Sequence, residues 1–565
     1  MKYYLFNFIL SFTSIIANSQ KILKENLTKK ETFYFDYLKT KPQSTGAYYK
    51  DGLGETKYKH GLWNYYNEEE KLIETREYYK DKLHGKVVFY YPNGKLRQEG
   101  YFKLGVQDSI NKEWFENGNI ATECFYKKGE LNGFKKTYYF DGHLEKVEEH
   151  IDSTKYVWEF YLADSIHSQS IEKGNGELII YHNTGTIKEF CAYENGIPHG
   201  EYLERSIYGY DLMSGNYNNG KREGEWKTYY YTGKIEKISL YKNDILEGTY
   251  QYFYDNGQLN VQGYYKNGLK ADEWTWYTKQ GNRDMQGNFE QGLQEGKWTY
   301  WYPSGELSYI AYYKKDLKEG TWTYYYKNGA KFKIGNYKND LKHGKWETFY
   351  ENGTLLMTGE YLFGKEEGEW YNFWENSQLK NKTTFKKGIM NGEWFSHFPN
   401  GDLKLMGKYK NGYKTGTWQE FYKGNKIKEI ITYKVVKKKS KIKYGPLKDL
   451  TTYESMKNGK YVLYSEIDSK LVEEGSYLKD EKNGEWKAYF PGSKFPANSI
   501  NYKNGKLNGT MKEFDKRGQV ISEIEYKDGL KHGKFRIYDK KGKIITEKKY
   551  SNGIQVTQGN GTFTP

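Results

Sequence analysis

Aromatic, small and polar residues recur along this chain in a pattern that returns every 24 residues. A glycine marks the start of each unit, a tryptophan follows at position two and a tyrosine or phenylalanine at position seventeen, as in Gly320, Trp322 and Tyr337. The markers keep this spacing without slippage from Gly176 to Gly416. A fixed period of this kind is typical of repeat architectures.

Each unit is predicted to form two antiparallel strands. Short aromatic-rich runs are bounded by a turn at positions eight and nine, such as Asn328-Gly329, and by a second turn such as Asn267-Gly268. Asn-Gly supplies the two positive φ angles that a type I′ turn needs. No helix-length window shows an apolar period of 3.6 residues. The pattern predicts an all-β fold, an elongated repeat array of about twenty antiparallel β-hairpins that form one long twisted sheet.

The hairpin register follows if positions eight and nine form the turn, because opposing positions then sum to seventeen. Position two faces position fifteen, which is usually glycine, so we expect Trp322 to lie opposite Gly335 and to fill the space above it. The marker glycine faces position seventeen, and position six faces position eleven. The residues that represent this structural pattern are Trp226, Trp298, Trp322, Trp346, Gly263, Gly335, Gly359 and Tyr337.

The repeat resembles a known family. Segments such as 296–307 and 337–346 look like MORN repeats, and more closely like the bacterial variant in YwqK-type proteins, which are commonly labelled antitoxins. The resemblance covers residues 58–555. It implies a row of β-hairpins, carries no catalytic residue, and suggests an antitoxin or immunity function.

Other segments flank or interrupt the repeats. Met1-Lys2, an apolar run and the small residues Ala17-Asn18-Ser19 predict a cleaved signal peptide, since the run is too short to span a membrane comfortably. We therefore expect an exported protein in the periplasm, at the cell surface or in the medium. The predicted organisation is a signal peptide (1–19), a degenerate cap (20–57), repeats (58–147), an eroded repeat (148–172), regular repeats (173–429), a basic eroded repeat (430–458), repeats (459–555) and a tail (556–565).

Composition supports a thin sheet. The 565 residues include 61 Tyr and 15 Trp, but hydrophobic residues make up only 37%. That share is below the usual 45–50% or so, which suits a sheet packed by amphipathic rings better than a deep aliphatic core.

The net charge of +15 includes a lysine cluster within 430–458. Such clusters can bind anionic lipid or polyanions, or they can be solvated segments that block edge pairing. The candidate anion-binding residues are Lys437, Lys438, Lys439 and Lys441.

Candidate chemistry is sparse. Cys124 and Cys191 both occupy position fifteen, about three repeats apart, which is too far for a disulfide. Five histidines precede marker glycines, where other units carry Glu, Asn or Thr, and no histidine spacing matches a zinc site. We expect no enzyme activity, no catalytic residue, no cofactor and no metal ligand.

The sequence favours an exported interaction scaffold that binds a protein, a glycan or an envelope component. One alternative is an antitoxin or immunity protein, and a second is a peripheral binder of anionic membranes. An export signal makes nucleic acid an unexpected partner, and no small-molecule substrate is evident. A glycan-active enzyme would need a carboxylate pair, and nothing in the sequence singles one out.

Overall fold

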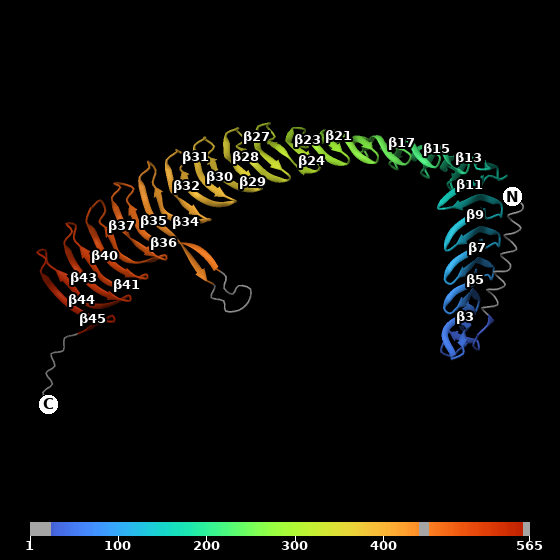
Figure 1. Cartoon of the computed structure of the whole chain (residues 1–565), viewed down its shortest axis with the longest axis horizontal. Coiled ribbons are helices and arrows are strands. Elements are labelled where there is room, and N and C mark those ends of the chain that lie inside the picture. Colours follow the sequence, from blue (N-terminus) through green and yellow to red (C-terminus); the bar gives the residue numbers. More distant parts are fainter. Residues whose placement is uncertain (1–23, 440–450, 557–565) are drawn as a thin grey trace, which may run out of the picture. The chain divides into compact units, whose positions relative to one another are not determined.

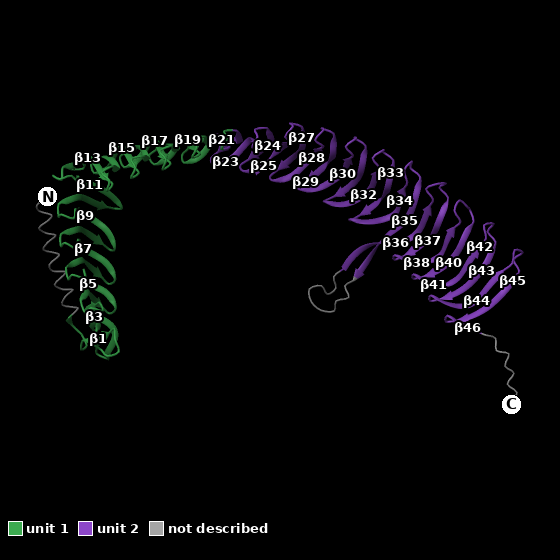
Figure 2. Ribbon diagram, turned by 180° about the vertical axis from the view of Figure 1, so that it is seen from behind, with its two compact units in different colours: residues 1–272, 279–281 green, residues 273–278, 282–565 purple. Residues whose placement is uncertain are grey.

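The computed structural model describes residues 24–439 and 451–556, which form 46 β-strands (Figure 1). The chain divides into unit 1, residues 1–272 and 279–281, and unit 2, residues 273–278 and 282–565 (Figure 2). The predicted signal peptide, most of the predicted tail and Lys441 lie outside the described residues.

The strands of unit 1 are β1 (Glu31–Tyr34), β2 (Pro42–Asp51), β3 (Gly54–Tyr66), β4 (Leu72–Tyr79), β5 (Lys82–Tyr90), β6 (Leu96–Lys103), β7 (Val106–Trp114), β8 (Ile120–Lys127), β9 (Glu130–Tyr138), β10 (Leu144–Ile151), β11 (Thr154–Tyr161), β12 (Gln169–Glu172), β13 (Asn175–Tyr181), β14 (Ile187–Glu194), β15 (Ile197–Arg205), β16 (Asp211–Asn218), β17 (Lys221–Tyr229), β18 (Ile235–Lys242), β19 (Ile245–Phe253) and β20 (Leu259–Lys266). The boundary between the units falls within β21 (Leu269–Tyr277).

The strands of unit 2 are β22 (Arg283–Glu290), β23 (Leu293–Trp301), β24 (Leu307–Lys314), β25 (Leu317–Lys318), β26 (Gly320–Tyr325), β27 (Lys331–Lys338), β28 (Leu341–Phe349), β29 (Leu355–Leu362), β30 (Lys365–Phe373), β31 (Leu379–Lys386), β32 (Ile389–His397), β33 (Leu403–Lys410), β34 (Tyr413–Phe421), β35 (Ile427–Lys439), β36 (Thr451–Tyr464), β37 (Leu471–Leu478), β38 (Glu481–Lys482), β39 (Gly484–Tyr489), β40 (Pro496–Lys503), β41 (Lys506–Leu507), β42 (Gly509–Phe514), β43 (Val520–Lys527), β44 (Leu530–Tyr538), β45 (Ile544–Ser551) and β46 (Ile554–Val556).

Each unit is an antiparallel array of hairpins. The described pairings join strands that follow one another along the chain, as β28 pairs with β29 and β29 with β30. Three further pairings pass over the two-residue strands β25, β38 and β41. The predicted all-β hairpin array is therefore confirmed. In the part of the chain that the structure describes, no helix is long and apolar enough to cross a membrane.

The predicted hairpin register is confirmed over most of its length. Trp322 pairs with Gly335, and the marker Gly320 pairs with Tyr337. The predicted pairing of positions six and eleven is wrong, because the register shifts by one residue and Tyr325, at position five, faces Lys331.

The first turn causes this shift. It is not the predicted type I′ turn, because Gly329 has a positive φ of 84° but Asn328 does not. The Tyr326 N–H donates to Ala330 O and the Gly329 N–H to Tyr326 O, which makes the loop longer than two residues.

The second turn has the type I′ geometry instead. Asn339 and Asp340 have φ values of 48° and 65°, and both central residues of a type I′ turn require a positive φ.

The tryptophans link successive hairpins. The predicted cover of Gly335 by Trp322 is wrong, because a Cβ built on Gly335 would lie 2.2 Å from Cδ2 of Trp346, in the following repeat. Gly335 pairs with Trp322 on one side and with Trp346 on the other, and the second ring lies over it. The same close approach recurs between Gly215 and Trp226, Gly287 and Trp298, Gly359 and Trp370, Gly407 and Trp418, and Gly475 and Trp486. Each glycine therefore makes room for the ring that joins its hairpin to the next one.

Ring size follows the space available. Tyrosine replaces tryptophan where the facing position fifteen carries a side chain larger than hydrogen, in the pairs Cys191 with Tyr202, Ser239 with Tyr250, and Ile431 with Tyr461. There are two exceptions: Trp394 pairs with Thr383, and Trp322 packs in one cluster with the buried Ala311.

Hydrogen bonds connect the first turns of neighbouring repeats. The position-six hydroxyl of Tyr326 donates to Phe349 O at 2.8 Å, and that of Tyr302 donates to Tyr325 O at 2.8 Å. Unit 1 has the same bond from Tyr230 to Phe253 O, at 2.6 Å. These bonds and the tryptophan rings hold the hairpins in a fixed lateral order.

Both irregular segments are hairpins. Residues 148–172, interpreted from the sequence as an eroded repeat, contain β11, a loop and the short strand β12. Residues 430–458, interpreted as a basic eroded repeat, contain most of the two long strands β35 and β36, which project beyond their neighbours in Figure 1. Lys439 pairs with Thr451, so this hairpin replaces the ordinary second turn of the repeat that begins at Gly416.

Candidate interaction surface

The predicted structural residues form the core of the array. The four tryptophans are almost fully buried, with 1% of Trp298 exposed and 4% each of Trp226, Trp322 and Trp346. Tyr337 packs edge-on between Trp322 and Trp346, at ring-centroid distances of 5.2 and 5.3 Å. Of the predicted glycines, Gly335 lies under Trp346, Gly359 lies under Trp370, and Gly263 pairs with Tyr250. Buried rings cannot serve as contact residues, so the interaction surface must lie elsewhere.

Lysines cover the edges of this aromatic core. The Nζ atoms of Lys318, Lys342 and Lys414 lie 4.9, 4.7 and 4.3 Å from the ring centroids of Trp322, Trp346 and Trp418. Cation–π contacts of this kind contribute about 0.5–1 kcal/mol at exposed sites. Some of the lysines therefore stabilise the fold through contacts with the core tryptophans.

Tyrosines beside the tryptophans are protonated and structural. Burial raises the pKa values of Tyr300 and Tyr324, and both rings pack against the cluster of Trp298 and Trp322. At neutral pH their hydroxyl groups can donate hydrogen bonds but carry no charge.

The opposite face of each hairpin is polar and exposed. Position one follows the marker residue, and its side chain points away from the tryptophan at position two because neighbours in a strand alternate between faces. The exposed residues at this position in unit 2 are Glu273, Lys297, Thr321, Lys345, Glu369, Glu393, Thr417, Lys460, Glu485 and Lys534. This column mixes both charges with hydroxyl groups and recurs on most hairpins of unit 2.

The candidate lysines lie on the projecting hairpin. Lys437 and Lys438 are exposed on β35, and Lys438 Nζ pairs with the Glu454 carboxylate at 2.5 Å. Tyr453, which pairs with Lys437, is 47% exposed. Lys439 ends β35, and Lys441 lies outside the described residues.

The residue before the marker glycine has a role that the sequence analysis missed. Glu319 accepts a hydrogen bond from the Asn339 N–H at 3.0 Å, and His84 Nδ1 accepts one from the Leu104 N–H at 3.3 Å. The mixture of His, Glu and Asn at this position therefore shares one property, a side-chain acceptor for the second turn. The signal was present in the sequence, because all three residue types carry an acceptor atom.

A comparison with protein families supports the repeat assignment. The family model described as the MORN repeat variant matches twelve segments: 83–104, 107–128, 222–243, 246–267, 294–315, 318–339, 342–362, 366–387, 390–411, 414–434, 507–528 and 531–552. The chain is a MORN-repeat protein. The match is to the repeat and does not distinguish the YwqK-type proteins among those that carry it.

No curated protein matches this MORN-repeat chain. Among solved structures, it is 10% identical to a chain in a crystal structure of TcdB2-TccC3-Cdc42, with 88% of this chain and 30% of that chain covered and a TM-score of 0.13. It is 11% identical to a chain of TcdB2-TccC3 without its hypervariable C-terminal region, with 88% and 30% covered and a TM-score of 0.12. The MORN-repeat chain thus spans 30% of the length of each of these solved chains, and scores this low carry no argument about its function.

Proposed function

We propose that this MORN-repeat protein is an exported, non-catalytic interaction scaffold that binds a protein, a glycan or an envelope component. The carrying observation is the exposed column at position one, which recurs on successive hairpins while the aromatic face is buried. Each hairpin adds two strand spacings, about 10 Å, so the same kind of contact is offered again at that interval. Such a surface suits an extended partner better than a compact ligand.

The mixed charge of this column supports a protein or glycan partner. Lys297 and Lys345 alternate along it with Thr321 and Glu369, so the column is not a uniformly basic strip of the kind that binds nucleic acid. Export, which rests on residues 1–19, stays a prediction. The antitoxin or immunity function stays a prediction from the family resemblance.

Crosslinking and pull-down of the full chain from its fractionated host test this proposal. The double variant Lys297→Glu/Lys345→Glu should lose the captured partner, because it reverses two charges of the position-one column. The matched control Lys314→Glu/Lys338→Glu makes the same charge change outside the position-one column, at exposed strand ends beside the second turns, and it should retain the partner. Equal capture by both variants, or a partner recovered only from the cytoplasm, would contradict the proposal.

The projecting hairpin supports a second candidate function, binding to an anionic membrane surface. Lys437, Lys438 and Tyr453 combine exposed positive charge with an exposed aromatic ring on one element. Basic residues contribute about 1 kcal/mol each near an anionic surface, and salt weakens the attraction.

Sedimentation with phosphatidylserine vesicles tests this second function. Binding should be salt-sensitive and should fall in Lys437→Glu/Lys438→Glu but not in Lys314→Glu/Lys338→Glu. No binding at low salt would remove the membrane hypothesis and leave the scaffold proposal intact.

A further inference from the structure

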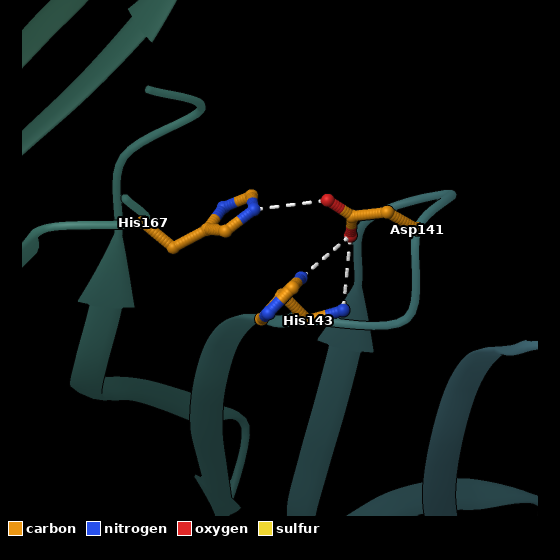
Figure 3. Close-up of side chains that lie close together, drawn as sticks. All are labelled: Asp141, His143 and His167. Atoms are coloured by element: carbon orange, nitrogen blue, oxygen red, sulfur yellow. Dashed lines mark hydrogen bonds and ion pairs between the residues drawn. The ribbon is translucent and has the colours of Figure 1, made fainter. Parts of the chain in front are cut away.

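Two histidines and an aspartate from successive turns meet in unit 1 (Figure 3). Asp141 and His143 lie in the turn between β9 and β10, and His167 lies in the loop between β11 and β12. Asp141 Oδ2 is 2.9 Å from His167 Nε2, and Asp141 Oδ1 is 3.2 Å from His143 Nδ1. The two imidazole rings stack with centroids 4.2 Å apart.

The irregular repeat brings His167 to this position. Its loop is closed by Asp164, whose side chain accepts the backbone N–H groups of Ile166 and Ser168, and His167 itself has a positive φ of 49°. The Tyr139 hydroxyl donates to Tyr161 O at 2.6 Å and fixes this loop against the turn of Asp141. The hydrogen bonds of Asp164 and Tyr139 therefore fix the backbone of the loop that carries His167.

The cluster replaces the usual contact between first turns. In other repeats an asparagine at position eight donates to the next turn, as Asn117 Nδ2 does to Phe140 O at 2.6 Å. Asp141 occupies position eight of its own repeat, and a carboxylate cannot donate. Its carboxylate faces the two histidines instead. Three atoms that can ligate a metal, one oxygen and two nitrogens, therefore lie close together.

We propose that Asp141, His143 and His167 bind one divalent late first-row transition-metal ion, such as Zn²⁺ or Cu²⁺. One ligand atom from each residue lies within 4.8 Å of the other two. Ligands about 2.0–2.1 Å from a shared metal are themselves about 3 Å apart, and each histidine nitrogen lies close to that distance from one oxygen of the Asp141 carboxylate. Imidazole and carboxylate ligands suit zinc and copper, and three protein ligands leave a position open for water.

The surroundings allow an ion to enter and remain. The side chains of His143 and Asp141 are 64% and 51% exposed, whereas that of His167 is only 17% exposed and is anchored. His167 Nδ1 is buried without a hydrogen-bond partner, so Nε2 is the nitrogen that faces the site. A carboxylate with two neutral imidazoles gives the site one negative charge, which favours a cation.

A bound ion would compensate for a weak junction. Where regular repeats place tryptophan over glycine, this repeat pairs Val157 with Glu148. The metal would link His143 and His167 across successive hairpins and close the segment 144–166 between them. We therefore assign the ion a structural role in the irregular segment 148–172.

Equilibrium dialysis of the untagged full chain against Zn²⁺, followed by metal analysis, tests this proposal. We expect one equivalent of Zn²⁺ per chain above any background, with less bound at lower pH, because protons compete with the metal for its ligands. His143→Gln should weaken binding by more than roughly 100-fold, because loss of an outer-shell partner alone costs about 10–100-fold. Other repeats carry glutamine at this position, as Gln258 and Gln378, so this exposed variant should fold.

His182→Tyr is the matched control. His182 Nε2 contacts Arg205 O in a neighbouring first turn, and tyrosine is the usual residue at that position, so this variant removes a histidine but keeps the contact. It should bind Zn²⁺ as the wild type does. Asn at position 167 tolerates the positive φ, so His167→Asn gives an independent second variant.

The Co²⁺-loaded chain provides a second readout, because its absorption spectrum reports nitrogen and oxygen ligation directly. Loss of the spectrum in both His143→Gln and His167→Asn, but not in His182→Tyr, would support the site. Failure of the wild type to bind more Zn²⁺, Cu²⁺ or Co²⁺ than His143→Gln would overturn it, and the cluster would then be only a hydrogen-bonded contact between turns.

Discussion

Replacement of Gly335 by valine tests the interpretation that each position-fifteen glycine leaves the space in which the tryptophan ring of the next repeat packs. The backbone of Gly335 lies outside the left-handed region, so a side chain is allowed there by conformation. Its Cβ, however, would lie 2.2 Å from Cδ2 of Trp346, a ring that is only 4% exposed and cannot move freely. The substitution therefore forces the ring away from the strand.

The structure sets the size of the effect. Overpacking of a well-packed core costs about 1–3 kcal/mol, and we expect about 2 kcal/mol for Gly335→Val. Alanine should cost less, since Ala311 is accommodated beside Trp322 in the same kind of position. Trp346→Tyr should partly rescue the valine variant, because tyrosine already faces Cys191, Ser239 and Ile431.

Hydrogen exchange on the intact chain is the appropriate assay, because a repeat array responds locally. A loss of 2 kcal/mol corresponds to roughly 30-fold faster exchange of the amides in β27 and β28. Gly52→Val is the control, since Gly52 is also outside the left-handed region and has no atom within 4 Å of its Cβ position. Unchanged protection in Gly335→Val, or no recovery on adding Trp346→Tyr, would refute the proposed contact.

Three further predictions concern other parts of the array. Tyr326→Phe removes the bond to Phe349 O and should cost about 1 kcal/mol, visible as faster exchange in the adjoining turns, whereas unchanged exchange would show that the hydroxyl contributes nothing. Burial, and next the charge of Lys103, lowers the pKa of His84 from its usual 6.5. The neutral ring accepts the hydrogen bond from the Leu104 N–H, so protection of this amide from exchange should be complete above pH 6.5. Protection should fall as the pH drops towards the lower pKa of His84 in the folded state. His84→Glu, which introduces the residue found in other repeats, should remove this pH dependence over that range. Burial raises the pKa of Cys191 to about 12, so its thiol should react with Ellman's reagent only after unfolding, and rapid reaction of the native chain would contradict this.

Much of the fold could be predicted from the sequence because the contacts within one hairpin lie close along the chain. A fixed period, two turns and a small residue at position fifteen were enough to place Trp322 opposite Gly335. The type of each turn was harder to predict, because Asn-Gly occurs both in two-residue turns and in longer loops. Only the register shift at Tyr325 shows that the longer loop is formed.

The candidate surface was less predictable than the fold. The structure buries the most recognisable residues of the repeat, such as Trp298, and the exposed column at position one carries no distinctive residue type. Clustered lysines such as Lys437 and Lys438 could be recognised, whereas their place on a projecting hairpin depended on the pairing of β35 with β36.

The sequence by itself determined the hairpin unit, its repetition and most of its internal register, because alternation and period fix which side chains share a face. Only the tertiary structure decided which ring covers which glycine, because the strand on either side of Gly335 offers a tryptophan and the lateral packing selects one. It also decided that Asp141 and His167 meet, because the contacts between the turns of neighbouring hairpins depend on how those hairpins pack. Contacts between repeats depend on how neighbouring hairpins pack, and a period along the chain does not specify that packing.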